Sequence, residues 1–309
     1  AQHAQSLQSM FAHIPGLKVV MPVTPEDAKG LLIASIQEDC PVIVLEHRSL
    51  FEREGPVPQD PYSTPLGKAV IKRSGSDATI IAASFMVIEA LEAADTMVLF
   101  RNAVKQICRR EGYHATFMCR PHLPNLFSSG WHLHQSLEEI KTGMNAFVPD
   151  ENDDLSLLGL NYVAGVLKHA CAGSVFTTPT VNGYKRFKPF SLAPDRAVWS
   201  RDNRGAMLRA IGGAGDKCTR VENRIGEPAA NPYLYIASQI IAGMNGIENK
   251  LDPGPPSQEP YQAESPTLPQ SLMEAVSALR EDSLFSTKFG EEFVNYIIKL
   301  KEGEIARFL

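Results

Sequence analysis

The chain has 309 residues, of which 44% are hydrophobic and 21% are charged, and its formal net charge at pH 7 is -5. This length suffices for one large domain or two ordinary ones, and the composition is typical of a globular protein with a buried core. The acidic balance excludes a general attraction to nucleic acid or to anionic membranes.

The first part of the chain alternates short apolar runs with turn signals. Residues 17–21, 41–46 and 78–83 are predicted strands. Thr24 followed by Pro25 predicts a helix that continues to Ile36, because Thr is a preferred N-cap and Pro suits the first helical position. The apolar runs lack clean alternation, as expected of strands covered on both faces. Strand, helix and strand in this order predict an α/β fragment with a doubly wound parallel sheet.

The second part has a different pattern. From Ser84 to Gly112 the composition favours a long helix, because neither Pro nor Gly interrupts a run of helix-forming residues. Strands are then predicted at residues 114–120, 131–137 and 218–225, and helices at residues 155–172, 231–245, 269–281 and 291–308. These elements predict an α+β domain, an antiparallel sheet with flanking helices.

The cysteines and the N-terminal residues indicate the cellular compartment of the protein and where the chain begins. Five cysteines, an odd number without any C-x-x-C pair, predict neither a disulfide framework nor a zinc ribbon and favour a reducing cytoplasm. No apolar stretch approaches the roughly 20 residues of a membrane span. The polar first residues lack a signal-peptide pattern and an initiator Met, which favours a chain that begins partway through a longer one.

One predicted strand carries residue types that bind metals and phosphates. His132, His134 and Ser136 share one face, because side chains along a strand alternate with a period of two. A neutral imidazole can ligate a divalent cation, and a hydroxyl can contact a ribose or phosphate oxygen. One H-x-H pattern is weak evidence alone, so a structural or surface role is the more common alternative.

Another predicted strand places Arg220, Glu222 and Arg224 on one face. Three charges are costly to bury unless they meet ligands. A hard cation on Glu222, with the arginines on phosphate or carboxylate groups, would account for all three. The alternative is a solvated face of salt-bridged side chains.

Further arginines lie among Gly and Pro turns. They are Arg186, Arg204 and Arg209. In an acidic chain, such guanidinium groups favour recognition of a polyanion over a role in solubility. Lys185 and Lys188 are more commonly surface charges than ligands.

Several motifs near the N-terminus carry a family resemblance. They are QHAQS at residues 2–6, HIPGLKVV at 13–20, DAKGLL at 27–32 and PLGKA at 65–69. With them, residues 1–94 resemble part of the pyrimidine-binding domain in the beta subunit of thiamine-diphosphate-dependent 2-oxo acid dehydrogenases. The resemblance implies a transketolase-like fold and links thiamine diphosphate to this segment by ancestry only. The family's activating Glu lies upstream of these residues, so His3 and Glu46 are expected to be a terminal histidine and a strand-end carboxylate.

Motifs in the rest of the chain carry a second resemblance. They are ATFM at residues 115–118, SGWHLHQS at 129–136, NGYKRF at 182–187, NR at 203–204, RVENR at 220–224 and AANPYL at 229–234. From about residue 90 to residue 309, the chain resembles the glutamine synthetase catalytic domain. The resemblance implies a carbon–nitrogen ligase. A substrate carboxylate attacks the terminal phosphate of ATP, and an amine then displaces phosphate from the acyl phosphate.

The second resemblance implies a role for each matching polar residue. Mg²⁺ or Mn²⁺ would be held by His132 and Glu222. The nucleotide would contact His134, Ser136, Arg204, Arg209 and Arg220, and the amino-acid substrate would contact Arg186 and Arg224. Arg204 and Arg224 are the expected catalytic residues, because neutralising the charge that develops on phosphate is the main lever in phosphoryl transfer.

Three departures from the ligase pattern bear on activity. Phe127 and Ser128 stand where the family carries Asn-Gly, which alters the expected glutamate contacts. Leu192 stands where the family carries a Glu that binds and deprotonates ammonium, so this segment resembles the branch that joins glutamate to larger amines. The carboxylates that bind the family's other metal lie upstream of residue 90, in sequence that is replaced here.

The two resemblances meet at residues 89–94, EALEAA, a stretch common to both patterns. A crossover there by recombination, engineering or misassembly of sequence reads would produce such a chain, whereas a selected fusion normally joins complete domains through a linker. We therefore predict a chimera of two partial domains, residues 1–94 and 95–309. Each would expose apolar faces and open sheet edges, so we expect weak folding and a ligase that is incomplete and inactive as this chain.

The expected partners are ATP, a glutamate-like substrate with an amine, and further copies of the chain in a homo-oligomer, with neither nucleic acid nor membrane. Two alternatives stay open. The chain is a beta-subunit fragment of a thiamine-dependent dehydrogenase, or it is a non-catalytic pseudoenzyme or assembly partner that binds subunits of the parent families.

Overall fold

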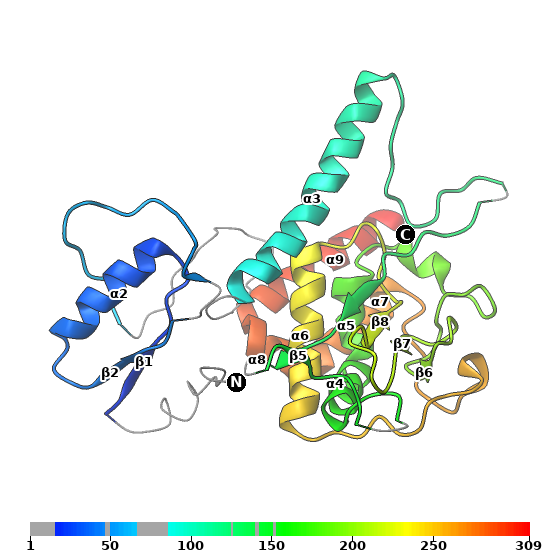
Figure 1. Ribbon diagram of the computed structural model, residues 1–309. Coiled ribbons are helices and arrows are strands. Elements are labelled where there is room, and N and C mark those ends of the chain that lie inside the picture. Colours follow the sequence, from blue (N-terminus) through cyan, green and yellow to red (C-terminus); the bar gives the residue numbers. More distant parts are fainter. Residues whose placement is uncertain (1–15, 47–49, 67–85, 125, 140–141, 151–152) are drawn as a thin grey trace. The chain divides into compact units, whose positions relative to one another are not determined.

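A computed structural model describes residues 16–46, 50–66, 86–124, 126–139, 142–150 and 153–309 (Figure 1). The chain forms two compact units, one ending at Met97 and the other beginning at Val98. The boundary falls inside the long helix α3 (Met86–Arg110). The presence of this helix confirms the prediction of a long helix between Ser84 and Gly112. His3 and the strand predicted at residues 78–83 lie outside the described residues.

The first unit contains a strand, a helix and a strand. β1 (Lys18–Val20) and β2 (Val42–Val44) pair in parallel, and α2 (Pro25–Gln37) connects them. The helix begins where the sequence predicts, because Thr24 and Asp27 form a capping box. The Thr24 hydroxyl accepts from the Asp27 N–H at 3.1 Å, and the Asp27 carboxylate accepts from the Thr24 N–H at 3.0 Å.

The second unit is built on a four-stranded sheet in the order β3-β8-β7-β6. Its strands are β3 (Leu133–Gln135), β6 (Trp199–Arg201), β7 (Leu208–Ile211) and β8 (Arg220–Asn223). β8 pairs antiparallel with both neighbours, as predicted, but β6 and β7 run parallel. The expectation of an antiparallel sheet is therefore confirmed for β3, β8 and β7 and wrong for the pairing of β6 with β7. In the loop that connects them, Asp202 has a φ of 45° and the Asn203 side chain accepts from the Gly205 N–H at 2.9 Å. A small second sheet joins β4 (Glu138–Glu139) to β5 (Met144–Asn145) in antiparallel pairing.

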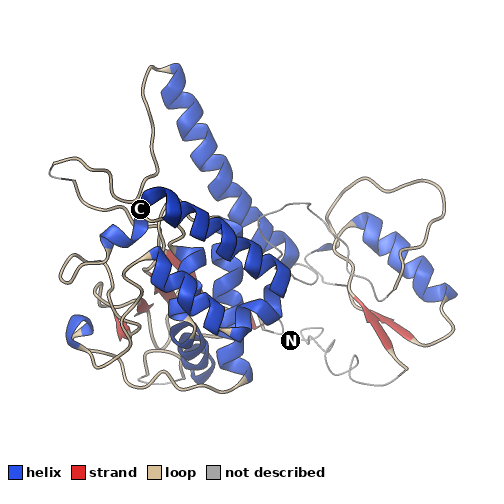
Figure 2. Ribbon diagram, turned by 180° about the vertical axis from the view of Figure 1, so that it is seen from behind, coloured by secondary structure: helices blue, strands red, loops and turns tan. Residues whose placement is uncertain are grey.

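Helices pack together on one side of this sheet (Figure 2). They are α4 (Leu157–Lys168), α5 (Ala170–Thr177), α6 (Pro232–Glu248), α7 (Leu272–Glu281), α8 (Ser283–Phe289) and α9 (Glu291–Phe308), with short 3-10 turns η2 (Gly183–Arg186) and η3 (Pro260–Gln262). α4 and α6 approach closely through glycines. A Cβ on Gly165 would lie 2.1 Å from the Ala242 carbonyl oxygen, and one on Gly246 would lie 2.0 Å from that of Asn161. Only glycine fits such a crossing.

The structure corrects two further predictions. Residues 114–120 form no strand. Instead, the Arg120 N–H donates to Oδ1 of Asn182 at 2.8 Å, and Nδ2 of Asn182 donates to the Arg120 carbonyl at 2.9 Å. The Asn182 side chain thus replaces a strand partner. The helix predicted over residues 155–172 is divided at His169 into α4 and α5. No helix among the described residues is long and apolar enough to cross a membrane.

Candidate active site

A cluster of charged side chains lies on the main sheet of the second unit. Its centre is Glu222, on the strand β8 between β3 and β7. The strand register places His134 opposite Glu222 on one side and Arg209 opposite it on the other. Residues directly opposite each other in neighbouring strands have side chains in contact. The fold therefore brings together residues that are far apart in the sequence.

Glu222 is almost fully buried, with 3% of its surface exposed, and both carboxylate oxygens have partners. Its Oε1 lies 2.8 Å from Nη1 of Arg224 and 2.9 Å from Nδ1 of His132, and its Oε2 accepts from Nη1 of Arg209 at 3.0 Å. Burial alone would raise the pKa of Glu222, but hydrogen bonds from His132, Arg209 and Arg224 lower it well below its ordinary value. The alternative of a solvated face is wrong for this residue.

His134 and Arg220 lie at the edge of the cluster. Nε2 of His134 is 3.8 Å from Oε1 of Glu222, and Arg220 donates from Nε to Nδ1 of His134 at 3.2 Å. The pKa of His134 is lowered, first by burial and then by nearby positive charges, against the attraction of Glu222. Ser136 is exposed, one residue beyond the end of β3.

Arg186 lies beneath the cluster and not in it. It is 5% exposed, donates from Nη1 to the Gly226 carbonyl at 3.0 Å and also donates to the Arg224 carbonyl. Within the described residues its Nε is buried without a hydrogen-bond partner. These contacts make Arg186 a support for the segment after β8 that carries Arg224.

Gly130 is a site residue that the sequence did not identify. A Cβ there would lie 2.5 Å from Nε2 of His132 and 2.8 Å from Nη1 of Arg186. Any side chain would push these two groups apart, so the glycine permits their close packing. The available signal was its place next to the histidine pair in the SGWHLHQS motif.

Two arginines depart from the predicted arrangement in different ways. The Arg204 side chain is exposed, and only its carbonyl joins the cluster, by accepting from Nε of Arg224 at 3.0 Å. Arg209 is shared, because its Nε also donates to Oδ1 of Asp202 at 2.9 Å. No local pattern singles out Asp202, which approaches Arg209 through the loop between β6 and β7.

Of the positions that depart from the ligase pattern, Leu192 contacts the cluster. Arg224 donates from Nη2 to the Leu192 carbonyl at 3.2 Å, which attaches the loop around Leu192 to the cluster. Phe127 is 92% exposed, and the Ser128 hydroxyl accepts from Nη1 of Arg120 at 2.6 Å. The aromatic ring at position 127 therefore faces solvent.

The donor set fits part of a divalent cation site. Two ligands at neighbouring corners of an Mg²⁺ octahedron lie about 3 Å apart, and His132 Nδ1 lies 2.9 Å from Glu222 Oε1. Arg224 Nη1 lies 3.4 Å from Nδ1 of His132 and 2.8 Å from Oε1 of Glu222, so a cation on this pair would have to displace the guanidinium. Within the described ranges, no group of three or more His, Cys, Asp or Glu side chains is arranged to hold a metal ion.

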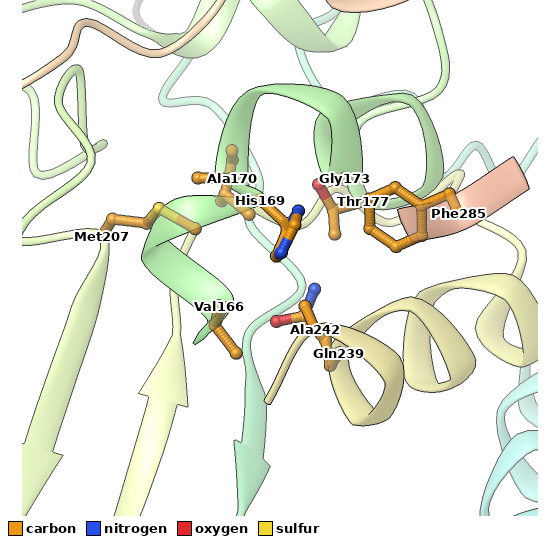
Figure 3. A pocket seen from close by; sticks show the side chains of 10 residues that line it. Val166, His169, Ala170, Gly173, Thr177, Met207, Gln239, Ala242 and Phe285 are labelled. Carbon is orange, nitrogen blue, oxygen red and sulfur yellow. The ribbon is translucent and has the colours of Figure 1, made fainter. Parts of the chain in front are cut away.

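A small cavity lies elsewhere in this unit, among α4, α5, α6 and α8, with His169 and Phe285 in its lining (Figure 3). Its volume is about 10 Å³, room for one water molecule at most, so it excludes a substrate. His169 lies 2.6 Å from the Asp282 carboxylate and 3.0 Å from the Asn245 amide oxygen, which joins α6 and α8 at the break between α4 and α5.

The second unit is thus a mixed α/β domain whose sheet brings arginines and a His–Glu pair together. Comparison with known families identifies the domain. The model of the glutamine synthetase catalytic domain matches residues 81–309, so the chain belongs to the glutamine synthetase family. A second model, the pyrimidine-binding domain of transketolase, matches residues 1–53. Both resemblances seen in the sequence are confirmed.

Individual relatives agree. A gamma-glutamylanilide synthase of Acinetobacter sp. is 54% identical over 229 residues, covering 73% of this chain and 46% of that protein. The glutamine synthetase of Vibrio alginolyticus is 38% identical over 226 residues, 69% of this chain and 47% of that protein. That of Thermus thermophilus is 39% identical over 232 residues, 71% of this chain and 51% of that protein. The chain therefore spans about half the length of these relatives.

Proposed function

We propose that residues 95–309 are the nucleotide- and metal-binding part of an ATP-dependent ligase that forms γ-glutamyl amides, and that residues 1–94 are a partial transketolase-like domain with a doubly wound sheet. One observation carries the ligase proposal. A buried glutamate, Glu222, contacts a histidine and two arginines drawn from separate strands and loops. Such a cluster suits a cation bound to phosphates.

The proposed roles follow from the contacts. His132 and Glu222 would hold Mg²⁺ or Mn²⁺, which would neutralise charge on the phosphates. His134, Ser136, Arg204, Arg209 and Arg220 would contact ATP. Arg186 and Arg224 would serve the glutamate substrate, Arg224 by direct contact and Arg186 by supporting Arg224 from below.

The reaction would proceed in two displacements. The γ-carboxylate oxygen of glutamate attacks the terminal phosphorus of ATP, and ADP leaves. The amine nitrogen then attacks the acyl carbon, phosphate leaves, and the nitrogen loses a proton. Arg204 and Arg224 would stabilise the charge that develops on the transferring phosphoryl group. We propose an aromatic amine as acceptor, which agrees with the name of the Acinetobacter relative and with Leu192 in place of a carboxylate.

We further propose that the chain binds Mg·ATP but does not turn over alone. The two adjacent donors, His132 and Glu222, leave an octahedral cation dependent on ligands from ATP, water or another chain. A homo-oligomer, the state expected from the resemblance, could supply them. Thiamine diphosphate is linked to the first unit by ancestry only.

Thermal unfolding with and without Mg·ATP tests this proposal. We expect Mg·ATP to raise the midpoint of the wild-type chain and not that of Glu222→Gln. Glu302→Gln is the matched control, because Glu302 also pairs with an arginine but both side chains are 52% exposed. Equal stabilisation of wild type and Glu222→Gln, or none in wild type, would contradict the proposal.

A further inference from the structure

A second cavity in the larger unit lies between β6, the loop after β7 and the segment before α4. Its volume is about 320 Å³, at the lower end of the range for small-molecule sites. The described residues that line it are Asp153, Arg201, Gly212, Gly213, Ala214 and Asp216.

This cavity is on the side of the main sheet away from the charged cluster. In the pairing of β6 with β7, Ser200 lies opposite Arg209, which belongs to the cluster. The next residue, Arg201, lies opposite Ala210, which is buried. Side chains alternate between the two faces of a sheet along each strand. Arg201 therefore points to the face that the cluster does not use.

Arg201 is the cation of the cavity. Its Nη1 lies 3.2 Å from Oδ1 of Asp154, whose side chain is 17% exposed. A Cβ on Gly213 would lie 4.0 Å from Nη2 of Arg201, so Nη2 faces the cavity. In the described part of the chain, Asp154 is its one charged partner. A guanidinium has five N–H donors, so Arg201 can hold Asp154 and still bind the carboxylate of a ligand.

Glycines form the wall that faces Arg201. Gly212, Gly213 and Gly215 have φ angles of 106°, 144° and 76°, which glycine adopts without a steric cost. The buried Thr219 hydroxyl fixes this loop by accepting from the Gly213 N–H at 2.9 Å. A Cβ on Gly213 would lie 3.9 Å from the Asp153 carbonyl oxygen, so it would occupy the space between the walls without a clash. The missing side chain keeps the cavity open.

Two exposed carboxylates, Asp153 and Asp216, complete the lining. Oδ1 of Asp216 accepts from the Cys218 N–H at 2.8 Å, and the Asp216 N–H donates to the Gly213 carbonyl at 3.1 Å. These bonds fix the side chain on the loop. Within the described ranges they leave Oδ2 of Asp216 without a partner, so it can accept from a ligand.

The two signs of charge select the kind of ligand. A dianion such as phosphate would meet the two aspartates, and a simple cation would meet Arg201, so like charges disfavour both. A molecule with a carboxylate and a separate ammonium group can pair with both kinds of side chain. A free α-amino acid has this form near neutral pH. The described lining has no large apolar side chain, so it gives an aromatic ring no surface on which to pack.

We propose that this cavity binds a small zwitterion of the α-amino acid class, with its carboxylate on Arg201 and its ammonium group on Asp216 and Asp153. The site is separate from the charged cluster, and it does not depend on the ligase function proposed above.

Saturation-transfer NMR of L-alanine with the full chain, in the absence of nucleotide, tests the site. We expect Arg201→Gln and Asp216→Asn each to weaken L-alanine binding about tenfold, the effect of losing one charged contact. The amide oxygen of Asp216→Asn can still accept from the Cys218 N–H, so the loop keeps its conformation. Acetate and ethylamine carry only one of the two charges each, and both should bind about tenfold more weakly than L-alanine.

Two matched controls should bind L-alanine as wild type does. Asp252→Asn alters an exposed aspartate whose Oδ1 also accepts from an N–H two residues ahead, that of Gly254, at 2.9 Å. Arg280→Gln removes an exposed arginine that pairs with Glu302. Glu222→Gln, in the charged cluster, should also leave L-alanine binding unchanged.

Three results would overturn the proposal. The first is no L-alanine binding by wild type, or undiminished binding by Arg201→Gln and Asp216→Asn. The second is binding that is lost in Glu222→Gln and kept in Arg201→Gln, which would place the amino acid at the charged cluster. The third is acetate binding as tight as that of L-alanine, which would show that the ammonium group makes no contact.

Discussion

The two units differ in whether their structure depends on local sequence signals or on contacts between distant segments. In the first, the described residues form a strand, a helix and a strand, and α2 leaves Leu32 and Ile36 exposed by 47% and 76%. In the second, helices cover one side of a sheet, and a buried glutamate contacts His132 just before β3, Arg209 in β7 and Arg224 just after β8. Local signals are enough to form a capped helix. A site requires distant segments to be packed together first.

The largest expected difference concerns glycines at close contacts. A Cβ on Gly246 meets the Asn161 backbone at 2.0 Å, whereas one on Gly30 meets side-chain atoms of Thr64 and Tyr62, at 2.3 Å and 2.7 Å. Backbone in a helix crossing cannot move aside as a loop side chain can. We expect Gly246→Ala to destabilise the second unit by about 3 kcal/mol, and Gly30→Ala to cost the first unit much less.

Tryptophan fluorescence during urea unfolding measures the Gly246 effect, because both tryptophans, Trp131 and Trp199, lie in the second unit. Gly303→Ala in α9 is the control. A Cβ at Gly303 meets nothing within 4 Å, so alanine should stabilise the helix by roughly 0.5–1 kcal/mol. An unchanged midpoint for Gly246→Ala would contradict the close crossing of α4 and α6.

Helix caps test whether the units unfold independently. Thr24 caps α2 in the first unit, and Asn231 caps α6 in the second, where its Oδ1 accepts from the Tyr233 and Leu234 N–H groups at 3.0 and 3.3 Å. Replacing either cap by alanine should cost about 1 kcal/mol. We expect only Asn231→Ala to shift the tryptophan transition, and Thr24→Ala to speed hydrogen exchange in α2 alone. A shift of the tryptophan transition by Thr24→Ala would show that the units are coupled.

These differences also explain what the sequence could predict. The helix predicted at residues 291–308 has the bounds of α9, and the Thr24 cap begins α2, because caps and helical periodicity act within a few residues. β6 and β7 were missed. They are as short as β3 and β8, but their sequences, WSR and LRAI, lack the alternating polar side chains that marked those strands.

The site shows the same division. Grouping Arg220, Glu222 and Arg224 needed only the strand period, and the association of His132 with Glu222 came from the family resemblance. The contact of Asp202 with Arg209 and the packing space beside Gly130 depend on loop conformations that no local pattern contains. Their discovery required coordinates.

A pH experiment sharpens the contrast between carboxylates. Asp27 in the first unit accepts backbone N–H groups at a helix start, whereas Glu227 is buried with 1% exposed. The pKa of Glu227 is raised, first by burial and also by the charge of Glu304. Hydrogen bonds from Thr180 and the charge of Arg186 lower it in part. The native state therefore holds the proton more tightly than the unfolded state does. The contribution of Glu227 to stability should therefore be greatest below the unfolded Glu pKa of about 4.3 and should fall as pH rises toward the raised native value.

Glu227→Gln should remove this loss, because the amide oxygen can still accept from Thr180 while no charge is buried. Urea unfolding followed by tryptophan fluorescence, near the ordinary Glu pKa and again near neutrality, gives the comparison. The stability of Glu227→Gln relative to wild type should rise between the two conditions. The exposed Glu248→Gln controls for the loss of one carboxylate. A relative stability that falls with rising pH would contradict the burial argument.

The smallest expected effect concerns Asp202 and depends on the proposed nucleotide site. Asp202 competes with any phosphate for Arg209, but its side chain is 68% exposed, so solvent screens the attraction. Asp202→Asn should therefore tighten Mg·ATP binding only two- to threefold or so, measured by calorimetry. Asp154→Asn, which removes the partner of Arg201 in the same unit, should leave the affinity unchanged. Weaker binding by Asp202→Asn would mean that the aspartate orients Arg209 for its ligand, since a guanidinium freed of a competitor can lose affinity only if it also loses its position.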